Sequence, residues 1–285
     1  MRPVWICPVC GAPLERRDRS LACSAHHSFD LARSGYVNLL LPQQKGSRDP
    51  GDNAEMVRSR SEFLGQGHYQ ALSDALNGQV LSLGLPSYTV LDAGCGEGYF
   101  LRRLQSALLA GLPPTNVTCL GVDISRAAVQ RAAKQGNDLQ VAVASTFHLP
   151  VITESVDVVL KVMAPGDPAE MRRVLRPGGC YLTVIPGPLH LQGLKRLIYR
   201  QTGPNEVDDS SLPGFRLLGE QTVERELHLG DSSAISSLLA MTPYYWNIDA
   251  VARQRVTACT ALDTPMQFII RQYAREDYPS DSQVR

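Results

Sequence analysis

Residues 90–98, with the sequence VLDAGCGEG, place three glycines and two acids between an apolar, strand-like run and a helix-like run. Glycines at such a turn let the backbone approach a ligand closely. A dinucleotide would bring its pyrophosphate to the N-terminus of the helix, where Asp92 and Glu97 would repel it. The two carboxylates instead favour a cationic ligand such as S-adenosylmethionine, which carries an ammonium and a sulfonium. The turn, which includes Gly94 and Gly96, therefore predicts a methyl-donor site.

Side chains that bind metals gather near the N-terminus. Cys7 and Cys10 form a Cys-x-x-Cys pair, and Cys23 follows across a spacer long enough for a small hairpin, with His26 and His27 just beyond. Zinc requires four soft or borderline ligands at tetrahedral corners, and two separate turns meet that need. We predict a zinc site of three cysteines and one of the two histidines; free thiols or a disulfide are the alternative. Metal binding would stabilise a segment that is too short for a core of its own.

Two further polar residues that could contact the donor lie at the ends of predicted strands. Asp123 closes the second strand of the expected nucleotide-binding pattern, where a carboxylate can accept hydrogen bonds from both ribose hydroxyls. The alternative is that Asp123 only caps the helix that follows. Ser145 ends the next strand, where it could contact adenine or be an ordinary loop hydroxyl.

Basic side chains follow the later strands. His190 comes just past the fifth strand, near the predicted active-site rim, although a lone histidine at a helix start is more often structural. Lys161, near the end of the fourth strand, could reach the methyl acceptor or neutralise a phosphate. Lys195, Arg196 and Arg200 could contact phosphates or form a solvated helix face.

The composition is that of a soluble globular protein. The chain has 285 residues, 44% of them hydrophobic, which suffices for one large α/β domain and a small appendage. Lysine plus arginine and aspartate plus glutamate number 28 each, so a nucleic-acid surface must be local. No apolar run approaches the ~20 residues that span a bilayer, and residues 1–7 lack a signal-peptide pattern. We expect a cytoplasmic protein without membrane contact, in which the scattered Cys95, Cys119, Cys180 and Cys259 are buried thiols.

Alternating strand and helix patterns must position these residues. From residue 88 onwards, right-handed crossovers predict a parallel, doubly wound α/β sheet with its ligand at the carboxyl ends of the strands. A helical pattern interrupted near Gly65 and Gly67 precedes it. The expected strands cover residues 88–91, 117–123, 139–144, 156–162, 180–185, 215–229 and 266–273.

The chain divides into three segments on this reading. We predict a zinc-binding domain at residues 1–42, a linker and helical segment at residues 43–85, and a methyltransferase domain at residues 86–285. The first segment is locally basic. Its arginines are Arg2, Arg16, Arg17, Arg19 and Arg33, against the acids Glu15, Asp18 and Asp30.

Together these motifs resemble the zinc-containing 23S ribosomal RNA guanine-N1 methyltransferases, a bacterial family that modifies a guanine in a hairpin lining the peptide exit tunnel. The likeness covers nearly the whole chain. The glycine turn is common to many methyltransferases, whereas the zinc segment and the GYVNLL run at residues 35–40 are far more specific. The other matching stretches are SFD at 28–30, SRDPGD at 47–52, GHY at 67–69 and PGPLHL at 186–191.

The resemblance implies a class I methyltransferase fold, with a Rossmann-like, doubly wound, seven-stranded sheet and a small N-terminal zinc-binding domain. It implies that His27, not His26, completes the zinc site. It also implies that Tyr69 and His190 line the donor pocket with Gly96 and Glu97, and that the protein is a homodimer.

The resemblance further bears on the acceptor. The SRDPGD stretch resembles the subgroup that methylates the earlier of two neighbouring hairpin guanines, rather than the macrolide-resistance subgroup. The stretch KVMAP at 161–165 keeps the Ala-Pro of the family but has Met163 where the resemblance implies an aromatic residue.

We therefore expect methyl transfer from S-adenosylmethionine to N1 of a guanine in 23S rRNA, with the zinc segment as the RNA reader. The pairing edge of guanine must be reached in a loop or by base flipping. The sequence shows no convincing general base for the N1 proton, so no catalytic residue is assigned. Two other classes stay open: a methyltransferase of a small molecule or quinone, and a non-catalytic RNA-binding or drug-sequestering protein that holds the donor as a structural ligand.

Overall fold

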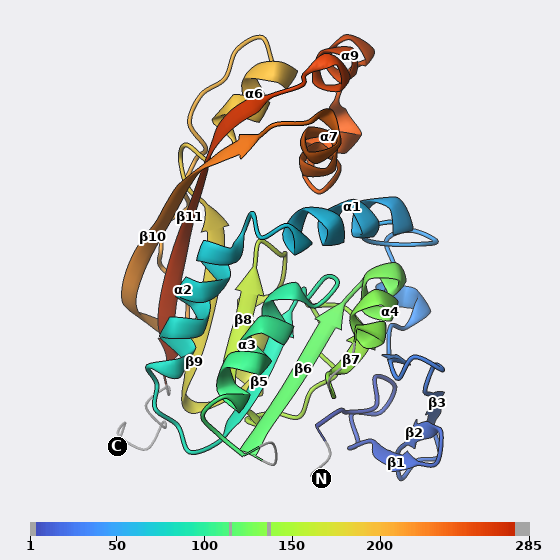
Figure 1. Ribbon diagram of the computed structural model, residues 1–285. Coiled ribbons are helices and arrows are strands. Elements are labelled where there is room, and N and C mark those ends of the chain that lie inside the picture. Colours follow the sequence, from blue (N-terminus) through green and yellow to red (C-terminus); the bar gives the residue numbers. More distant parts are fainter. Residues whose placement is uncertain (1–3, 114–115, 136–137, 277–285) are drawn as a thin grey trace.

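The computed structural model describes residues 4–113, 116–135 and 138–276. Figure 1 shows one large twisted sheet with helices packed against it and a small three-stranded sheet near the N-terminus. Arg2, one of the arginines counted in the basic N-terminal segment, lies outside the described residues.

Within those residues, eight strands form the large sheet in the order β10-β11-β9-β8-β5-β6-β7-β4. Neighbours from β4 to β9 run parallel, and β11 is antiparallel to both β9 and β10. The bounds are β4 Val37–Asn38, β5 Tyr88–Ala93, β6 Val117–Asp123, β7 Gln140–Val143, β8 Val156–Val162, β9 Leu175–Pro186, β10 Phe215–Leu229 and β11 Leu262–Arg275.

The seven predicted strands are all present, so the doubly wound α/β sheet is confirmed. The short β4 is an eighth strand that the prediction did not include. It comes from the GYVNLL run and covers the edge of β7, where Leu39 N–H donates to the carbonyl of Val143 at 2.9 Å. Pairing with β4 provides hydrogen-bond partners for backbone N–H and C=O groups that would be unpaired at an open sheet edge.

Helices connect and cover the strands. They are α1 Ala54–Gly65, α2 Gln70–Leu81, α3 Tyr99–Leu109, α4 Arg126–Lys134, α5 Pro168–Val174, α6 Gln192–Ile198, α7 Ser232–Ala240, α8 Tyr244–Asn247 and α9 Ala250–Ala258, with a 3₁₀ turn at Pro42–Gln44. The predicted break between α1 and α2 is present: Gly67 there has a φ of +83°, a conformation that side-chain-bearing residues rarely adopt. No helix of the described ranges combines the length and apolar composition needed to cross a bilayer.

The sheet buries apolar residues on both faces. On one face, Leu72 of α2 and Leu104 of α3 pack in the cluster that contains Val158. On the other face, Trp5 packs in the cluster that contains Leu91 and Val159. Burial on both faces explains why the central strands are nearly continuous apolar runs in the sequence.

The N-terminal segment is docked on this second face. Its small sheet consists of β1 Glu15–Arg17, β2 Ser20–Ala22 and β3 Ser28–Asp30. Ile6 N–H donates to the carbonyl of Pro150 at 2.9 Å, and Ile152 N–H donates to the carbonyl of Val4 at 3.0 Å. The segment thus shares the core of the large sheet, in addition to any stabilisation by a metal.

Candidate functional site

A cavity of about 710 Å³ opens at the carboxyl ends of β5, β6, β8 and β9. The strand order reverses between β8 and β5, which is where doubly wound sheets bind their ligands. The cavity brings together residues that are far apart in the sequence. All seven side chains or glycines predicted to bind the donor line it: Tyr69, Asp92, Gly94, Gly96, Glu97, Asp123 and His190.

The glycine turn connects β5 to α3 at the floor of this cavity. Gly94 has a φ of +90°, and a Cβ there would collide with the Cβ of Ala164, at the exit of β8. The amides of Gly94 and Cys95 donate to the carbonyl of Val122 at 2.8 and 3.0 Å. Only glycine satisfies both the backbone angle and the close approach at position 94.

Asp92 is buried at the end of β5, with 1% of its surface exposed. Its Oδ1 has no hydrogen-bond partner in the part of the chain that the structure describes. Burial, and next the charge of Asp123, raise the pKa of Asp92 to about 7. A buried carboxylate oxygen without a partner is costly unless a donor or cation meets it, so Asp92 fits a cationic group of a ligand.

Asp123 is held in place by the backbone. Its Oδ2 accepts from the Gly96 amide and its Oδ1 from the Ser125 amide, each at 2.8 Å. Burial raises the pKa of Asp123, and these two hydrogen bonds oppose that rise. Ser125, not Asp123, caps α4, because its Oγ accepts from the Ala128 amide at 3.1 Å. The capping alternative for Asp123 is therefore wrong.

Glu97 differs from Asp92 in having a counter-charge. It is buried, and its Oε2 lies 3.4 Å from the guanidinium of Arg102. The argument that two acids select a cation therefore rests mainly on Asp92.

Tyr69 and His190 form one aromatic wall with Phe268. The ring centroids of Tyr69 and Phe268 are 5.0 Å apart, and those of His190 and Phe268 are 4.3 Å apart. His190 Nδ1 accepts from the amide of Gln267 at 3.3 Å. Burial, and next the charge of Lys195, lower the pKa of His190 to about 3. The imidazole is neutral at physiological pH and carries its proton on Nε2, so it is a hydrogen-bond donor there and not a base.

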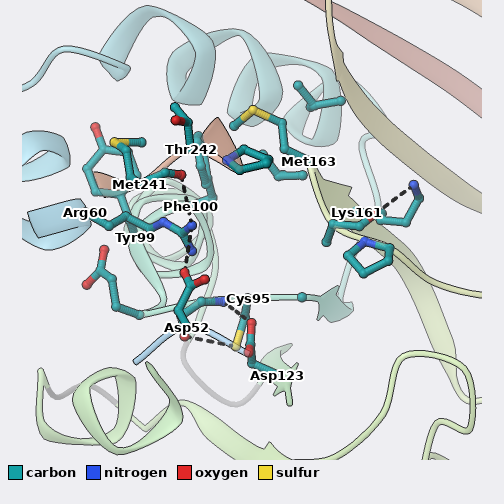
Figure 2. A pocket seen from close by; sticks show the side chains of 18 of the residues that line it. Asp52, Arg60, Cys95, Tyr99, Phe100, Asp123, Lys161, Met163, Met241 and Thr242 are labelled. Carbon is teal, nitrogen blue, oxygen red and sulfur yellow. Dashed lines mark hydrogen bonds and ion pairs between the residues drawn. The ribbon is translucent and has the colours of Figure 1, made fainter. Parts of the chain in front are cut away.

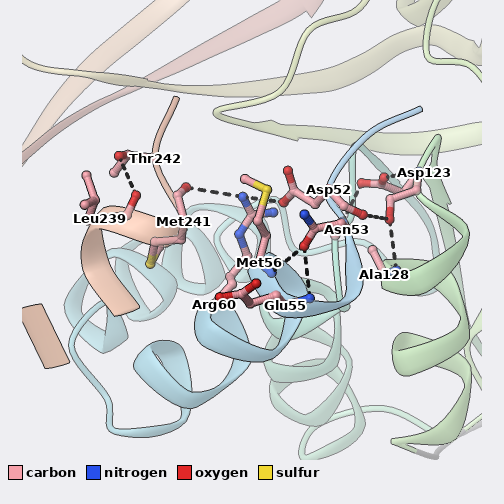
Figure 3. A network of polar contacts seen from close by, with 12 residues as sticks. Asp52, Asn53, Glu55, Met56, Arg60, Asp123, Ala128, Leu239, Met241 and Thr242 are labelled. Atoms are coloured by element: carbon pink, nitrogen blue, oxygen red, sulfur yellow. Dashed lines mark hydrogen bonds and ion pairs between the residues drawn. The ribbon is translucent and has the colours of Figure 1, made fainter. Parts of the chain in front are cut away.

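An arginine that the sequence analysis did not consider connects three parts of the cavity wall. Arg60 of α1 forms an ion pair with Asp52 at 2.8 Å and donates to the carbonyl of Met241 at 3.4 Å. Ser125 Oγ donates to the carbonyl of Asp52 at 2.6 Å. Figures 2 and 3 show this network from the SRDPGD loop to the segment after α7. In the sequence, Arg60 has the pattern of an arginine on the solvent-facing side of an amphipathic helix. No sequence signal therefore marks it as a residue of the site.

The candidate residues at the ends of β7 and β8 differ in whether they line the cavity. Lys161 lines the cavity, as does Met163. Ser145 is buried but does not line it, and its Oγ accepts from the Phe147 amide at 3.2 Å, as an ordinary loop hydroxyl does. The adjacent Thr146 lines the cavity in its place.

The three basic residues after His190 lie outside the cavity lining. Lys195 donates to the side chain of Asn205, and Arg196 and Arg200 are exposed. Of the scattered cysteines, Cys95, Cys119 and Cys180 are buried as predicted, whereas Cys259 is half-buried.

The predicted metal ligands meet in the N-terminal segment. One ligand atom from each of Cys7, Cys10, Cys23 and His27 lies within 4.8 Å of all the others. Cys10 and Cys23 Sγ are 3.7 Å apart, and His27 Nδ1 is 3.5 Å from Sγ of both Cys7 and Cys23. A zinc ion with Zn–S of about 2.3 Å and Zn–N of about 2.0 Å would place tetrahedral ligands about 3.5–3.8 Å apart. The residues fit zinc.

Two turns create this cluster. Gly11 N–H donates to the carbonyl of Cys7, which folds the first pair back on itself. His26 has a φ of +63° and is exposed, and the turn around it brings the His27 carbonyl to the Cys23 amide at 3.0 Å. The structure thus selects His27 from the two histidines.

Comparison with known proteins gives two family matches. The model described as "RlmA, N-terminal" matches residues 5–48, and the model described as "Methyltransferase domain" matches residues 90–179.

Three curated proteins are similar over most of their length. The 23S rRNA (guanine(748)-N(1))-methyltransferase of Streptomyces fradiae is 35% identical over 251 residues, which covers 85% of this chain and 86% of that protein. A protein of Micromonospora griseorubida, named for guanine-N(1) methylation of 23S rRNA, is 37% identical, covering 91% and 92%. A similarly named protein of Bacillus subtilis (strain 168) is 32% identical, covering 85% and 86%.

Proposed function

This chain belongs to the 23S rRNA (guanine-N1)-methyltransferase family, and from that premise we propose that it methylates N1 of a guanine in a 23S rRNA hairpin loop that lines the peptide exit tunnel. The observation that carries the proposal is the pairing of two sites in one chain. At the carboxyl edge of the sheet lies a donor-type cavity, in which the buried Asp92 Oδ1 has no hydrogen-bond partner among the described residues. A zinc-type cluster lies in the segment docked on that sheet.

We propose that Tyr69, Asp92, Gly94, Gly96, Glu97, Asp123 and His190 bind S-adenosylmethionine. Bound there, the donor supplies a methyl group on a positively charged sulfur. Asp92 would receive the ammonium, because its Oδ1 lacks a partner among the described residues. Asp123 would accept from the ribose hydroxyls, since each carboxylate oxygen has a second lone pair beyond its backbone hydrogen bond.

Holding the donor and the base in contact would supply much of the rate. Tyr69 and His190, on one wall of the cavity, are both buried. Since His190 is a neutral Nε2–H donor, it does not remove the N1 proton of guanine. No general base is assigned.

Cys7, Cys10, Cys23 and His27 would hold the zinc ion and thereby fix the shape of the small sheet. Arg16, Arg17, Arg19 and Arg33 are all exposed on this segment. Exposed arginines bind phosphate oxygens, which supports the zinc segment as the RNA reader. The acceptor guanine would enter the cavity from a loop or after flipping.

The same proposal covers the organisation of the protein. Residues 1–42 would recognise RNA, residues 43–85 would link and partly roof the cavity, and residues 86–285 would carry out the transfer. We further propose that the protein acts in the cytoplasm and that it is a homodimer, as the family resemblance suggests for the dimer.

The resemblance of the SRDPGD loop to the subgroup that methylates the earlier of the two neighbouring hairpin guanines supports that guanine as the acceptor. Gly51 and Asp52 of this loop line the cavity. The name of the Streptomyces fradiae relative favours a second candidate, guanine 748. Incubating the protein with labelled S-adenosylmethionine and unmodified 23S rRNA, and then mapping the methyl group, decides between them. Transfer only to small molecules, or stoichiometric donor binding without turnover, would contradict both.

A further inference from the structure

Lys161 stands at the carboxyl end of β8, half-buried, and lines the cavity. Its Nζ donates to the carbonyl of Ala164 at 3.1 Å. An ammonium group has three N–H donors, and this hydrogen bond uses one of them. Two donors therefore remain available to a ligand in the cavity.

The exit of β8 lies directly against the donor turn. Ala164 packs so closely on Gly94 that a Cβ on the glycine would not fit. Lys161 is fixed to the same Ala164, so it lies beside the turn that would hold the donor. Figure 2 shows Lys161 on the side of the cavity away from Arg60 and Asp52. Lys161 thus lines the cavity wall across from the Arg60–Asp52 ion pair.

Lys161 differs in charge and pairing from the other basic side chains that line the cavity. Of the other basic side chains lining the cavity in the described ranges, Arg60 is paired with Asp52 and His190 is neutral. Burial lowers the pKa of Lys161, and the charge of Asp208 opposes that shift. A partly desolvated cation interacts more strongly with a developing negative charge than a cation in water does.

We propose that Lys161 contacts the acceptor guanine and stabilises the negative charge that N1 and O6 share when N1 loses its proton. The inference rests on the proposed function and names a catalytic group for it. In the reaction, the N1–H bond breaks and the proton leaves to bulk water. The N1 lone pair then forms the N1–CH3 bond, the S–CH3 bond breaks, and its electron pair stays on the sulfur as a neutral thioether. Lys161 donates a hydrogen bond to O6 throughout.

The test compares Lys161→Met and Lys161→Arg with Lys134→Met, a matched change at an exposed lysine of α4. Each full-length variant is assayed on a synthetic hairpin RNA under single-turnover conditions, and its affinity for S-adenosylmethionine is measured by calorimetry. Lys161→Met should slow transfer by about 10²- to 10³-fold, as loss of one charge-stabilising donor does. Donor affinity should stay within threefold. Lys161→Arg should recover part of the rate, and Lys134→Met should match the unsubstituted protein.

A second substrate separates a charge effect from a folding defect. With 6-thioguanine in place of the acceptor guanine, N1 is more acidic, so the loss caused by Lys161→Met should shrink at least tenfold. A structural defect would reduce transfer to both acceptors equally, and that result would overturn the inference. So would a Lys161→Met variant that keeps its transfer rate within threefold, or one whose only defect is weaker donor binding. If the unsubstituted protein methylates no guanine N1, it is the proposed function that fails.

Discussion

The guanidinium of Arg60 and the carboxylate of Asp52 lie 2.8 Å apart and join α1 to the SRDPGD loop above the donor turn. The same guanidinium nitrogen donates to the carbonyl of Met241, after α7. Three segments that are distant in the sequence therefore meet on one side chain at the cavity wall. This contact explains how a polar loop without regular structure can form part of a binding site.

Arg60→Ala should weaken S-adenosylmethionine binding by about 3- to 10-fold, because a partly exposed ion pair of this kind contributes up to about 1 kcal/mol and the Met241 contact is lost as well. Calorimetric titration measures the affinity of the variant for S-adenosylmethionine. Arg58→Ala, an exposed arginine of the same helix, is the matched control and should bind normally. Equal affinities for both variants would mean that Arg60 does not shape the donor site.

Asp92→Asn should stabilise the ligand-free protein at pH 8 and weaken donor binding by at least tenfold. The pKa of Asp92 rises from 3.8 to about 7 on folding. Between those pH values the folded protein holds a proton that the unfolded chain has released, so this group lowers stability as pH rises from about 4 to about 7. The amide has no charge to bury and cannot form an ion pair with the ammonium.

Thermal melting at pH 5 and pH 8, together with calorimetry of donor binding, measures both effects of the change at Asp92. Asp18→Asn, in an exposed turn, serves as control. An Asp92→Asn variant that binds S-adenosylmethionine as tightly as the unsubstituted protein would remove Asp92 from the donor site.

Cys23→Ser should lower bound zinc from one ion per chain towards none and abolish RNA methylation, while donor affinity stays within threefold. The reason is that three remaining ligands hold zinc poorly and the small sheet loses its fixed shape. Metal analysis, methyl transfer and calorimetry measure the three quantities. Cys259→Ser, at a thiol outside the cluster, should leave all of them unchanged. Normal methylation by zinc-free Cys23→Ser would refute the role given to the zinc segment.

Gly94→Ala should abolish donor binding, because the new Cβ would meet Ala164 and the backbone angle of +90° disfavours any side chain. Gly111→Ala, which adds a Cβ in open space, should bind the donor normally. Calorimetry on both proteins provides the comparison. Donor affinity within threefold for Gly94→Ala would show that the turn tolerates a side chain and that its shape does not decide binding.

Much of the fold could be predicted because parallel strands buried on both faces are continuous apolar runs. The predicted strand at residues 215–229 has the same bounds as β10. In contrast, β4 is a two-residue strand whose partner β7 lies about a hundred residues later, and no local pattern reveals such a pairing. Helix α9 was missed because its residues, Ala250–Ala258, form no clear apolar stripe.

The site was predictable where chemistry needs particular residue types at fixed spacing. Cys7, Cys10 and the glycine-turn residues Asp92, Gly94, Gly96 and Glu97 are of this kind, whereas Tyr69 and His190 were implied by the family resemblance. The structure gathers the metal ligands and the donor candidates as two groups. Contacts between segments were not predictable. The Arg60 network does not follow from the sequence, since it depends on where distant backbones come together.

The central claim is that one chain combines a donor site with a zinc-dependent RNA reader to methylate guanine N1 in 23S rRNA. The most direct measurement is mass spectrometry of 23S rRNA after reaction with S-adenosylmethionine and either the unsubstituted protein or Cys23→Ser. We predict 1-methylguanosine at a single hairpin position with the unsubstituted protein and none with the variant. A methyl group on another atom or another class of RNA, or no methyl group on any RNA, would contradict the account.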